Sequence, residues 1–139
     1  SAAAIGTAQA AVDTAANHAK ERIQFNQPIG SFQALAHRLA KMQTEVDKSR
    51  LLAYRLASGI DNGEDCTRLA SQAKWSTTET LKYVTEEGMQ IMASAGYSTE
   101  SPMQRYWRDA RLYTFGEGSS ELQLDLIAYN MGLGRALKR

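Results

Sequence analysis

The sequence predicts an all-α fold, an up-and-down four-helix bundle, for three reasons. Apolar residues recur every three or four positions over long stretches of the chain. Its two prolines, Pro28 and Pro102, fall where this pattern stops. No segment alternates apolar and polar residues over the length of a strand. We therefore expect residues 1–139 to form a single helical domain.

The first helix is expected from about Ala3 to Arg22. Its inward side is rich in alanine, which forms helices well and lets a neighbouring helix pack closely. The inward residues, spaced by three or four, are Ile5, Ala8, Val12, Ala15, Ala19 and Ile23. Asn26, Pro28 and Gly30 then interrupt the pattern and predict a connection.

The second helix is expected to start at a cap supplied by Gly30 or Ser31 and to end near Ser58. Its apolar stripe alternates steps of three and four, which is typical of long antiparallel helices crossing at a shallow angle. The stripe consists of Phe32, Leu35, Leu39, Met42, Val46, Ser49, Ala53 and Leu56. Gly59 and the Asp-Asn-Gly run at 61–63 predict a tight turn after this helix.

The third helix is expected from about Glu64 to Met92. Its single cysteine, Cys66, is interpreted as a small buried side chain rather than a reactive thiol. The expected inward residues are Cys66, Leu69, Ala73, Thr77, Leu81, Val84 and Ile91.

Two shorter helices are expected after a stretch rich in glycine and aromatic residues. The first runs from about Pro102 to Asp109, with proline at its first position. The second starts at Ser119 or Ser120 and ends near Gly132. Its expected inward residues are Leu122, Leu126, Ile127 and Met131.

Composition limits the classes of function. Sixteen basic and fifteen acidic residues leave a formal charge of +1, which gives no electrostatic reason to expect a nucleic-acid partner. One cysteine and two distant histidines do not have metal-ligand spacing, so we expect no metal. No apolar run is long enough to span a bilayer, and no targeting peptide is recognisable. Because the chain starts with Ser1 inside a helical pattern, we expect a piece of a longer protein.

The run from Phe115 to Glu121 reads Phe-Gly-Glu-Gly-Ser-Ser-Glu. Glu117 therefore lies between two glycines, just before a helix N-terminus whose free amides can bind an anion or a carbonyl oxygen. A carboxylate here acts as a general base if a substrate excludes water and raises its pKa. In the alternative, Gly118 makes a turn, Ser119 caps the helix and Glu117 is a solvated acid that complements the helix dipole. The run alone does not decide between them.

Three separated segments together resemble the acyl-CoA dehydrogenase family. Residues 19–33, AKERIQFNQPI followed by FQ, are similar to the family's ERxQFGxPI…Q segment. Residues 90–97, QIMASAGY, resemble its QIxGGxGY turn. Residues 106–123 run from YWRDAR to GEGSSELQ and are similar to YRDAR…YEGTSEIQ. The order and spacing agree over nearly the whole chain.

The resemblance implies the four-helix C-terminal domain of a three-domain flavoenzyme that forms a homo-oligomer and binds FAD. It implies that Glu117 removes the α-proton of an acyl-CoA thioester while a hydride passes from the β-carbon to the flavin, giving a trans-2-enoyl-CoA. The domain by itself lacks most of the flavin and acyl pockets, so we expect it to be inactive alone. The expected acceptor is an electron-transfer flavoprotein or a similar protein, and the expected location is the cytoplasm, or the mitochondrial matrix in a eukaryote.

The same resemblance implies two groups of cofactor contacts. The first would touch the pyrophosphate and adenosine end of an FAD bound mainly by a neighbouring subunit, and it consists of Arg22, Gln24, Phe25, Gln33, Gln90 and Ser94. In the second, Ser119 and Glu121 would face the flavin, and the amide of Gly118 would approach the substrate. The alternative for Arg22 is a charge that satisfies helix-end carbonyls, and for Phe25 it is a core position.

The chain departs from the family pattern at several positions. Asn26 replaces a glycine, and Ala93-Ser94 replaces a glycine pair. Gly116 stands where a large aromatic residue usually covers the flavin or the substrate, and Tyr129 stands where many members have arginine. These changes imply an unusual acyl group, a bulkier substrate that fills the space at Gly116, or a member that has lost some chemistry. The alternative function is a non-catalytic helical assembly module derived from this family.

A cluster of charged residues precedes the Gly-Glu-Gly run. We expect it to form structural salt bridges rather than a phosphate site. Its members are Arg105, Arg108, Asp109 and Arg111.

Overall fold

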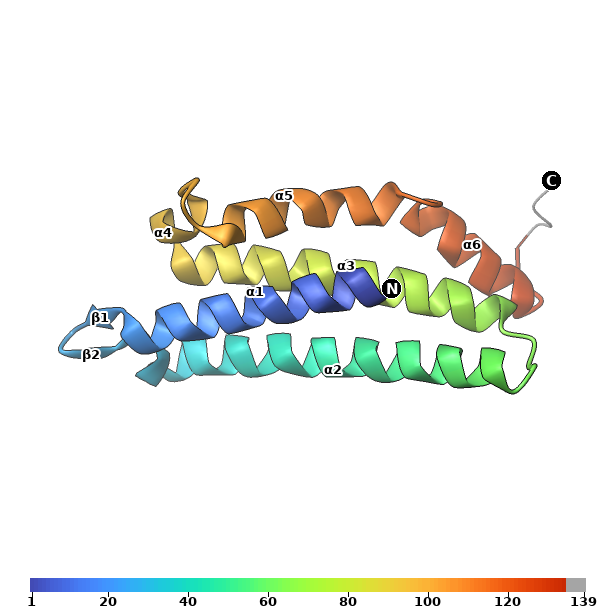
Figure 1. The fold of residues 1–139 in the computed structure, drawn as a ribbon, viewed down its shortest axis with the longest axis horizontal. Helices are drawn as coiled ribbons and strands as arrows, with labels where there is room; N and C mark the ends of the chain where they lie inside the picture. Colours follow the sequence, from blue (N-terminus) through green and yellow to red (C-terminus); the bar gives the residue numbers. More distant parts are fainter. Residues whose placement is uncertain (135–139) are drawn as a thin grey trace.

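The computed structural model describes residues 1–134, which form an elongated helical bundle (Figure 1). Three long helices lie side by side, and two shorter helices follow one another along the remaining side. The long helices are α1 (Ala2–Glu21), α2 (Gln33–Asp61) and α3 (Thr67–Met92). The shorter ones are α5 (Pro102–Phe115) and α6 (Ser120–Asn130). The all-α fold predicted from the sequence is confirmed.

Short elements make the connections at the left end of Figure 1. A hairpin joins α1 to α2 through β1 (Ile23–Gln24), β2 (Gln27–Pro28) and a 3₁₀ turn, η1 (Ile29–Ser31). A single helical turn, α4 (Ser94–Tyr97), joins α3 to α5. The two strands have two residues each, too few for alternation to predict them.

Helix α3 is the centre of the bundle, because it packs against α1, α2, α5 and α6. Small residues bring its neighbours close. The buried side of α1 includes five alanines, Ala4, Ala8, Ala11, Ala15 and Ala19. On α3, a Cβ added at Gly88 would lie 2.7 Å from the Cε of Met103 on α5. The alanine stripe expected on the first helix is therefore its packing surface, as predicted.

The boundaries of the second and third helices differ from the expected ones. Phe32 rather than Gly30 or Ser31 precedes the first turn of α2, because those residues belong to η1. Helix α2 continues to Asp61 and buries Gly59 within it, where a Cβ would meet the Sγ of Cys66 at 2.7 Å. Gly63 has a φ of +71°, which confirms the predicted glycine turn.

Helix α3 begins at Thr67 instead of Glu64, since local hydrogen bonds hold the preceding residues outside the helix. The amide of Glu64 donates to the Gly59 carbonyl at 2.9 Å, and the Asp65 carboxylate accepts from the Thr67 amide at 3.0 Å. Cys66 is half-buried at the start of this helix.

The fourth side of the bundle differs most from the expectation. Helix α5 extends to Phe115 rather than ending at Asp109, because its buried stripe continues through Ala110 and Thr114. Pro102 stands in its first turn as predicted, and the hydroxyl of Ser101 caps it by accepting from the Met103 amide at 3.2 Å.

Three expected core positions are wrong. Ile23 is 54% exposed because it lies in the hairpin beyond the end of α1. Leu122 and Met131 are 40% and 59% exposed, and the residue that α6 buries is Gln123. Helix α6 contacts the bundle chiefly through α3, so much of its apolar surface has no neighbour.

The expected salt bridges among the arginines of α5 are also wrong. Within residues 1–134, no ion pair joins Asp109 to these arginines. Asp109 lines one groove beside α5, whereas Arg108 and Arg111 line another. The guanidinium of Arg111 instead lies 6.0 Å from the centre of the Phe115 ring.

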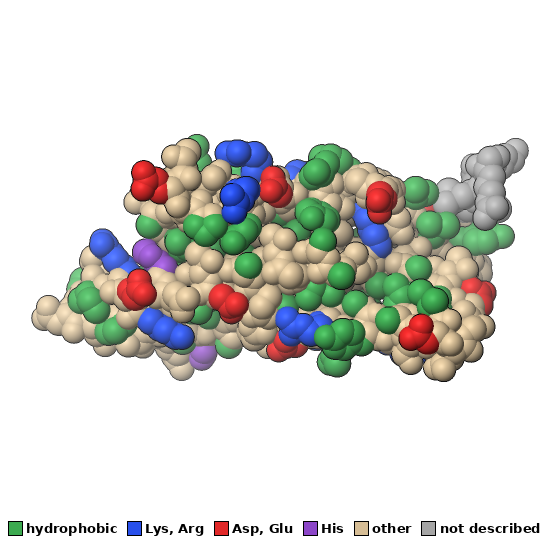
Figure 2. Space-filling view, in the orientation of Figure 1, with side chains coloured by type: hydrophobic (Ala, Val, Ile, Leu, Met, Phe, Trp, Pro, Cys, Tyr) green, Lys and Arg blue, Asp and Glu red, His purple; other side chains and the backbone are tan. Residues whose placement is uncertain are grey.

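Exposed apolar side chains occur over the face shown in Figure 2, most of them over the half of the bundle that contains the ends of α2 and α6. The largest exposed ones on these two helices are Leu51, Tyr54, Ile60, Leu124 and Tyr129. No helix in the described part of the chain is long and apolar enough to cross a membrane.

Candidate active site around Glu117

Glu117 stands on the turn between α5 and α6, in a backbone conformation that side chains rarely adopt. Its φ is +55°, and the φ of Gly118 is +98°. A left-handed conformation costs a residue with a Cβ about 1–2 kcal/mol. At Gly118 a Cβ would also lie 2.8 Å from the Nε2 of Gln123, so this position requires glycine. The strained turn leaves the Glu117 side chain exposed.

The helix after this turn is capped as predicted by Ser119, whose hydroxyl accepts from the Leu122 amide at 3.3 Å. The expected choice between Ser119 and Ser120 is thereby resolved. The cap is one of the three roles that the solvated-acid alternative assigned to this run, so it does not by itself distinguish the two interpretations of Glu117.

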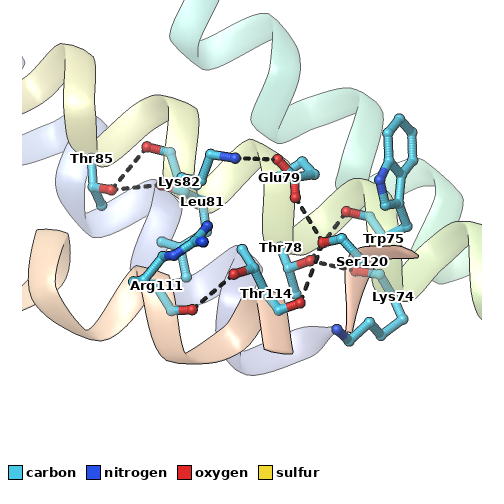
Figure 3. Close-up of polar contacts among 10 residues, drawn as sticks. All are labelled: Lys74, Trp75, Thr78, Glu79, Leu81, Lys82, Thr85, Arg111, Thr114 and Ser120. Carbon is cyan, nitrogen blue, oxygen red and sulfur yellow. Dashed lines mark hydrogen bonds and ion pairs between the residues drawn. The ribbon is translucent and has the colours of Figure 1, made fainter. Parts of the chain in front are cut away.

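Side chains of helix α3 hydrogen-bond to the turn on both sides of Ser119, and Figure 3 shows the contact of Glu79 with Ser120. The Nζ of Lys74 donates to the Gly118 carbonyl at 2.6 Å. The hydroxyl of Ser120 donates to the Oε1 of Glu79 at 2.8 Å, and Lys82 holds the other oxygen of that carboxylate at 2.7 Å. The Lys74–Gly118 and Ser120–Glu79 hydrogen bonds join residues that are 44 and 41 positions apart in the sequence.

The charges around these contacts compensate one another. Burial opposes the ionisation of Glu79, but hydrogen bonds from Lys82 and Ser120, together with the charges of Lys82 and Arg111, hold its pKa below the usual value. Burial lowers the pKa of Lys74, against the opposing effect of Glu79, Glu117 and Glu121.

Glu121 follows the turn on the first turn of α6. Hydrogen bonds from its own backbone amide and from the Ser119 hydroxyl lower the pKa of the Glu121 carboxyl. This ionised acid at a helix N-terminus complements the helix dipole.

A groove of ≈ 610 Å³ lies beside Glu117. It is bounded by the start of α1, by α3 and by α5, and the residues that line it are Ser1, Ala3, Lys74, Thr78, Asp109, Leu112, Tyr113, Gly116 and Glu117. A carboxylate, an ammonium group and apolar walls thus meet in one concave surface. Such a surface suits a substrate with an apolar part and a group that gives up a proton.

Gly116 leaves part of this groove unfilled. Its backbone φ of −64° is open to any residue, and a Cβ there would lie 3.2 Å from the Leu112 carbonyl oxygen. A side chain would fit after a shift of a few tenths of an ångström. The glycine is therefore required neither by the backbone nor by a severe clash, and its effect is the room it leaves.

The residues expected near the adenosine end of FAD lie at the end of the bundle that holds the hairpin and α4, far from the Glu117 turn (Figure 1). All six are exposed: Arg22, Gln24, Phe25, Gln33, Gln90 and Ser94. Lys74 beside the Glu117 turn and Ala93 beside α4 are separated by about 28 Å of helix α3. The structure therefore divides the expected site residues into two distant groups.

The hairpin in the first group has an unusual exposed aromatic residue. Phe25 is 85% exposed and contacts the ring of Phe32 edge-on, with centroids 6.0 Å apart, so the core alternative for Phe25 is wrong. Phe25 and Asn26 both have positive φ, as the two central residues of a tight hairpin require. Asparagine tolerates this conformation better than most residues, which accounts for its presence at a family glycine position.

Ala93 shows the cost of another departure. Its φ is +50° and its ψ is −132°, a combination that favours glycine. The chain keeps the sharp bend between α3 and α4 without the glycine that the family pattern has there.

The contacts of Lys74 and Glu79 with the turn were missed by the sequence analysis. A usable signal existed for Lys74, because this residue shares one helical face with Thr78, Leu81 and Thr85, at steps of four, three and four. Those three residues are buried, so the lysine faces inward with them. Nothing in the sequence indicated which loop it would meet.

Comparison with known proteins identifies the family. A family model of the acyl-CoA dehydrogenase C-terminal domain matches residues 1–132 of the sequence. The 3-(aryl)acrylate reductase of Clostridium sporogenes is 41% identical over 128 residues, which are 92% of this chain and 34% of the relative. The caffeyl-CoA reductase-Etf complex subunit CarC of Acetobacterium woodii is 40% identical over 124 residues, 89% of this chain and 33% of the relative.

The fold gives the same result. The structure of butyryl-CoA dehydrogenase from Megasphaera elsdenii superposes with a TM-score of 0.90 at 34% identity, covering 92% of this chain and 33% of that one. The chain spans about a third of the length of these relatives. It belongs to the acyl-CoA dehydrogenase family and corresponds to its C-terminal domain.

Proposed function

We propose that this chain is part of an FAD-dependent enzyme that interconverts an acyl-CoA thioester and its trans-2-enoyl form, with Glu117 as the base that takes the α-proton. The observation that carries this proposal is the Glu117 turn. It presents a carboxylate at the edge of a groove, on a strained backbone that two side chains of α3 hold in place. A glutamate that is only a solvated surface acid would need neither a groove beside it nor a strained backbone.

The chemistry asks three things of this chain. The α-proton is acidic enough only when the thioester oxygen is polarised. We assign the amide of Gly118 as a hydrogen-bond donor to this oxygen or to a neighbouring part of the substrate. The Glu117 carboxylate takes the proton. The apolar walls of the groove exclude water, which raises the basicity of the carboxylate once substrate binds. FAD, when bound, supplies the acceptor for the hydride from the β-carbon.

The residues of the hairpin end fit an FAD that another copy of the protein holds. Arg22 and Gln24 are exposed polar side chains suited to pyrophosphate and adenine, and exposed Phe25 offers a flat apolar surface. They lie too far from Glu117 along α3 to serve a group packed against the same turn. We infer a homo-oligomer in which Ser119 and Glu121 of one copy and the hairpin end of another contact each FAD.

The acyl group that fits this groove is bulkier than a short straight chain. Gly116 leaves open a part of the groove that an aromatic side chain would occupy. Two relatives at 40% identity or more are named for aryl acrylate and caffeyl substrates. We therefore propose an aryl or similarly wide acyl group.

The caffeyl relative belongs to a complex with Etf, and we propose an electron-transfer flavoprotein or a similar protein as redox partner. The proposed location is the cytoplasm, or the mitochondrial matrix in a eukaryote.

The test uses the full-length protein that contains this chain. We expect it to retain FAD and to show bleaching of the flavin absorbance when an acyl-CoA of the proposed class is added without oxygen. Glu117→Gln should abolish bleaching while FAD stays bound. The matched control is Glu100→Gln, because Glu100 is an exposed acid in the loop before α5. It should bleach normally.

Two outcomes would count against the proposal. A full-length protein that never binds FAD would favour the alternative, a helical assembly module without catalytic activity. Retained FAD with bleaching that survives in Glu117→Gln would leave the enzyme in place and remove Glu117 as its base.

A further inference from the structure

We propose that Lys74 is a positioning residue for Glu117: it holds the turn between α5 and α6 through the Gly118 carbonyl and keeps a positive charge beside the Glu117 carboxylate. This inference rests on the proposed role of Glu117 and deepens it. Lys74 itself does not take or give the substrate proton.

The first support is the contact. The Nζ of Lys74 donates to the carbonyl oxygen of Gly118, the residue directly after Glu117, at 2.6 Å. A short bond from a charged donor in a partly buried setting is stronger than a neutral one. Since Glu117 and Gly118 both have positive φ, their peptide would relax to ordinary conformations if nothing held it. The bond from Lys74 fixes the carbonyl of the next peptide group, between Gly118 and Ser119, and so limits rotation at Gly118.

The second support is the location of the ammonium. Lys74 and Glu117 line the same groove. The charged groups near the ammonium include Glu79 on α3, Glu117 in the turn and Glu121 on α6, and Asp109 on α5 lines the same groove. Three of these acids act on Lys74 in the direction that keeps it protonated.

The third support is the desolvation cost of placing a lysine at position 74. Lys74 continues the stripe of Thr78, Leu81 and Thr85 that packs toward α5, and its burial opposes its charge. A methionine would occupy a similar volume without that desolvation cost. The lysine is explained by what its charge does at the turn, where the acids of α6 and the loop offset the penalty.

Loss of the charge should therefore change the mobility of the turn and the placement of the base. Lys74→Met removes the tether of Gly118 and the ammonium that lines the groove with Glu117. The matched control is Lys48→Met, because Lys48 is an exposed lysine in the middle of α2, paired with Glu45 at 2.7 Å. Lys74→Arg keeps the charge and a donor and tests for rescue.

The first measurement is hydrogen–deuterium exchange of the full-length protein, followed in the peptide that covers residues 115–122. Lys74→Met should exchange faster than wild type in this peptide and in no peptide from α2, while Lys48→Met should match wild type there. Equal exchange in Lys74→Met and wild type would overturn the tether. This result does not depend on turnover, so it stands even if the proposed function fails.

The second measurement is kinetic. We expect Lys74→Met to lower kcat by about tenfold to a hundredfold with little change in KM, as misplacement of a reacting group does. Lys74→Arg should recover part of kcat. Faster exchange with unchanged kcat would leave Lys74 a structural residue and overturn its positioning role.

Discussion

Gly118 carries the tightest local constraint of the candidate site. Its φ of +98° and the 2.8 Å approach of Gln123 to a Cβ exclude other residues without movement. We predict that Gly118→Ala lowers the free energy of unfolding by about 1–3 kcal/mol. Gly6→Ala is the control, because Gly6 lies in α1 with nothing near its Cβ position. It should raise stability by about 0.5–1 kcal/mol, as alanine does in an exposed helix. Urea denaturation of both variants measures the difference, and equal effects would show that the turn is not strained.

Gly116 is predicted to set the width of the acyl group. Gly116→Tyr should lower kcat/KM for aryl acyl-CoA by about tenfold or more, since the new ring occupies the same part of the groove. Activity with a short straight-chain acyl-CoA should be retained or increased. Steady-state kinetics of the full-length protein with both substrates gives the ratio. A ratio that stays at the wild-type value would mean that Gly116 does not face the acyl group.

Among the elements, the link between α3 and α6 depends on the ionisation of Glu79. Its pKa in the folded protein lies below the ordinary value of 4.5 for a glutamate, so folding favours the ionised form. The resulting stability is fully present well above pH 4.5 and is lost as the pH falls through the lowered pKa. We predict that Glu79→Gln is less stable than wild type at neutral pH, by about 1 kcal/mol or less, because the pair with Lys82 is partly exposed.

The same variant provides its own control through pH. The difference in unfolding free energy between Glu79→Gln and wild type should shrink as the pH falls below 4.5, since wild-type Glu79 then becomes neutral too. Denaturant titrations at a series of pH values measure it. A difference that is constant across this range would mean that the Glu79 charge does not stabilise the link.

The long helices could be predicted from local pattern, and the contacts among elements could not. The alanine stripe of α1 and the stripe of α3 are repeats within one segment, and periodicity reports them directly. The end of α5 was missed because the buried residues beyond Asp109 are only Ala110 and Thr114, one small and one polar, so the apolar period there is weak. The contact of Lys74 with Gly118 spans 44 residues and depends on how two helices dock, which no local pattern contains.

The sequence names candidate site residues but does not contain their arrangement. The Gly-Glu-Gly run marked Glu117, and the hairpin segment marked Arg22 and Phe25. What the sequence left out was that these groups are separated by most of the length of α3 and that the turn at Glu117 is strained. Both facts depend on tertiary packing: the first on the direction of the helices, and the second on the side chains of α3 that hold the turn.

For the whole molecule, the two distant groups predict that one FAD is shared between two copies. Co-expression of Arg22→Ala and Glu117→Gln full-length chains in equal amounts tests this. If each site takes Arg22 from one copy and Glu117 from another, random assembly leaves about a quarter of the sites free of both changes. Activity should therefore appear in the mixture although neither variant alone is active. A mixture as inactive as the separate variants would place both residues at the same copy's site.

Isotope exchange tests Glu117 as the base for the α-proton without relying on hydride transfer. The full-length protein is incubated in D₂O with an acyl-CoA analogue whose β-carbon is replaced by oxygen, so that no hydride can leave. We predict that wild type and Glu100→Gln incorporate deuterium at the α-carbon, and that Glu117→Gln does not, because removal and return of that proton need the carboxylate. Incorporation by Glu117→Gln at the wild-type rate would contradict the assignment.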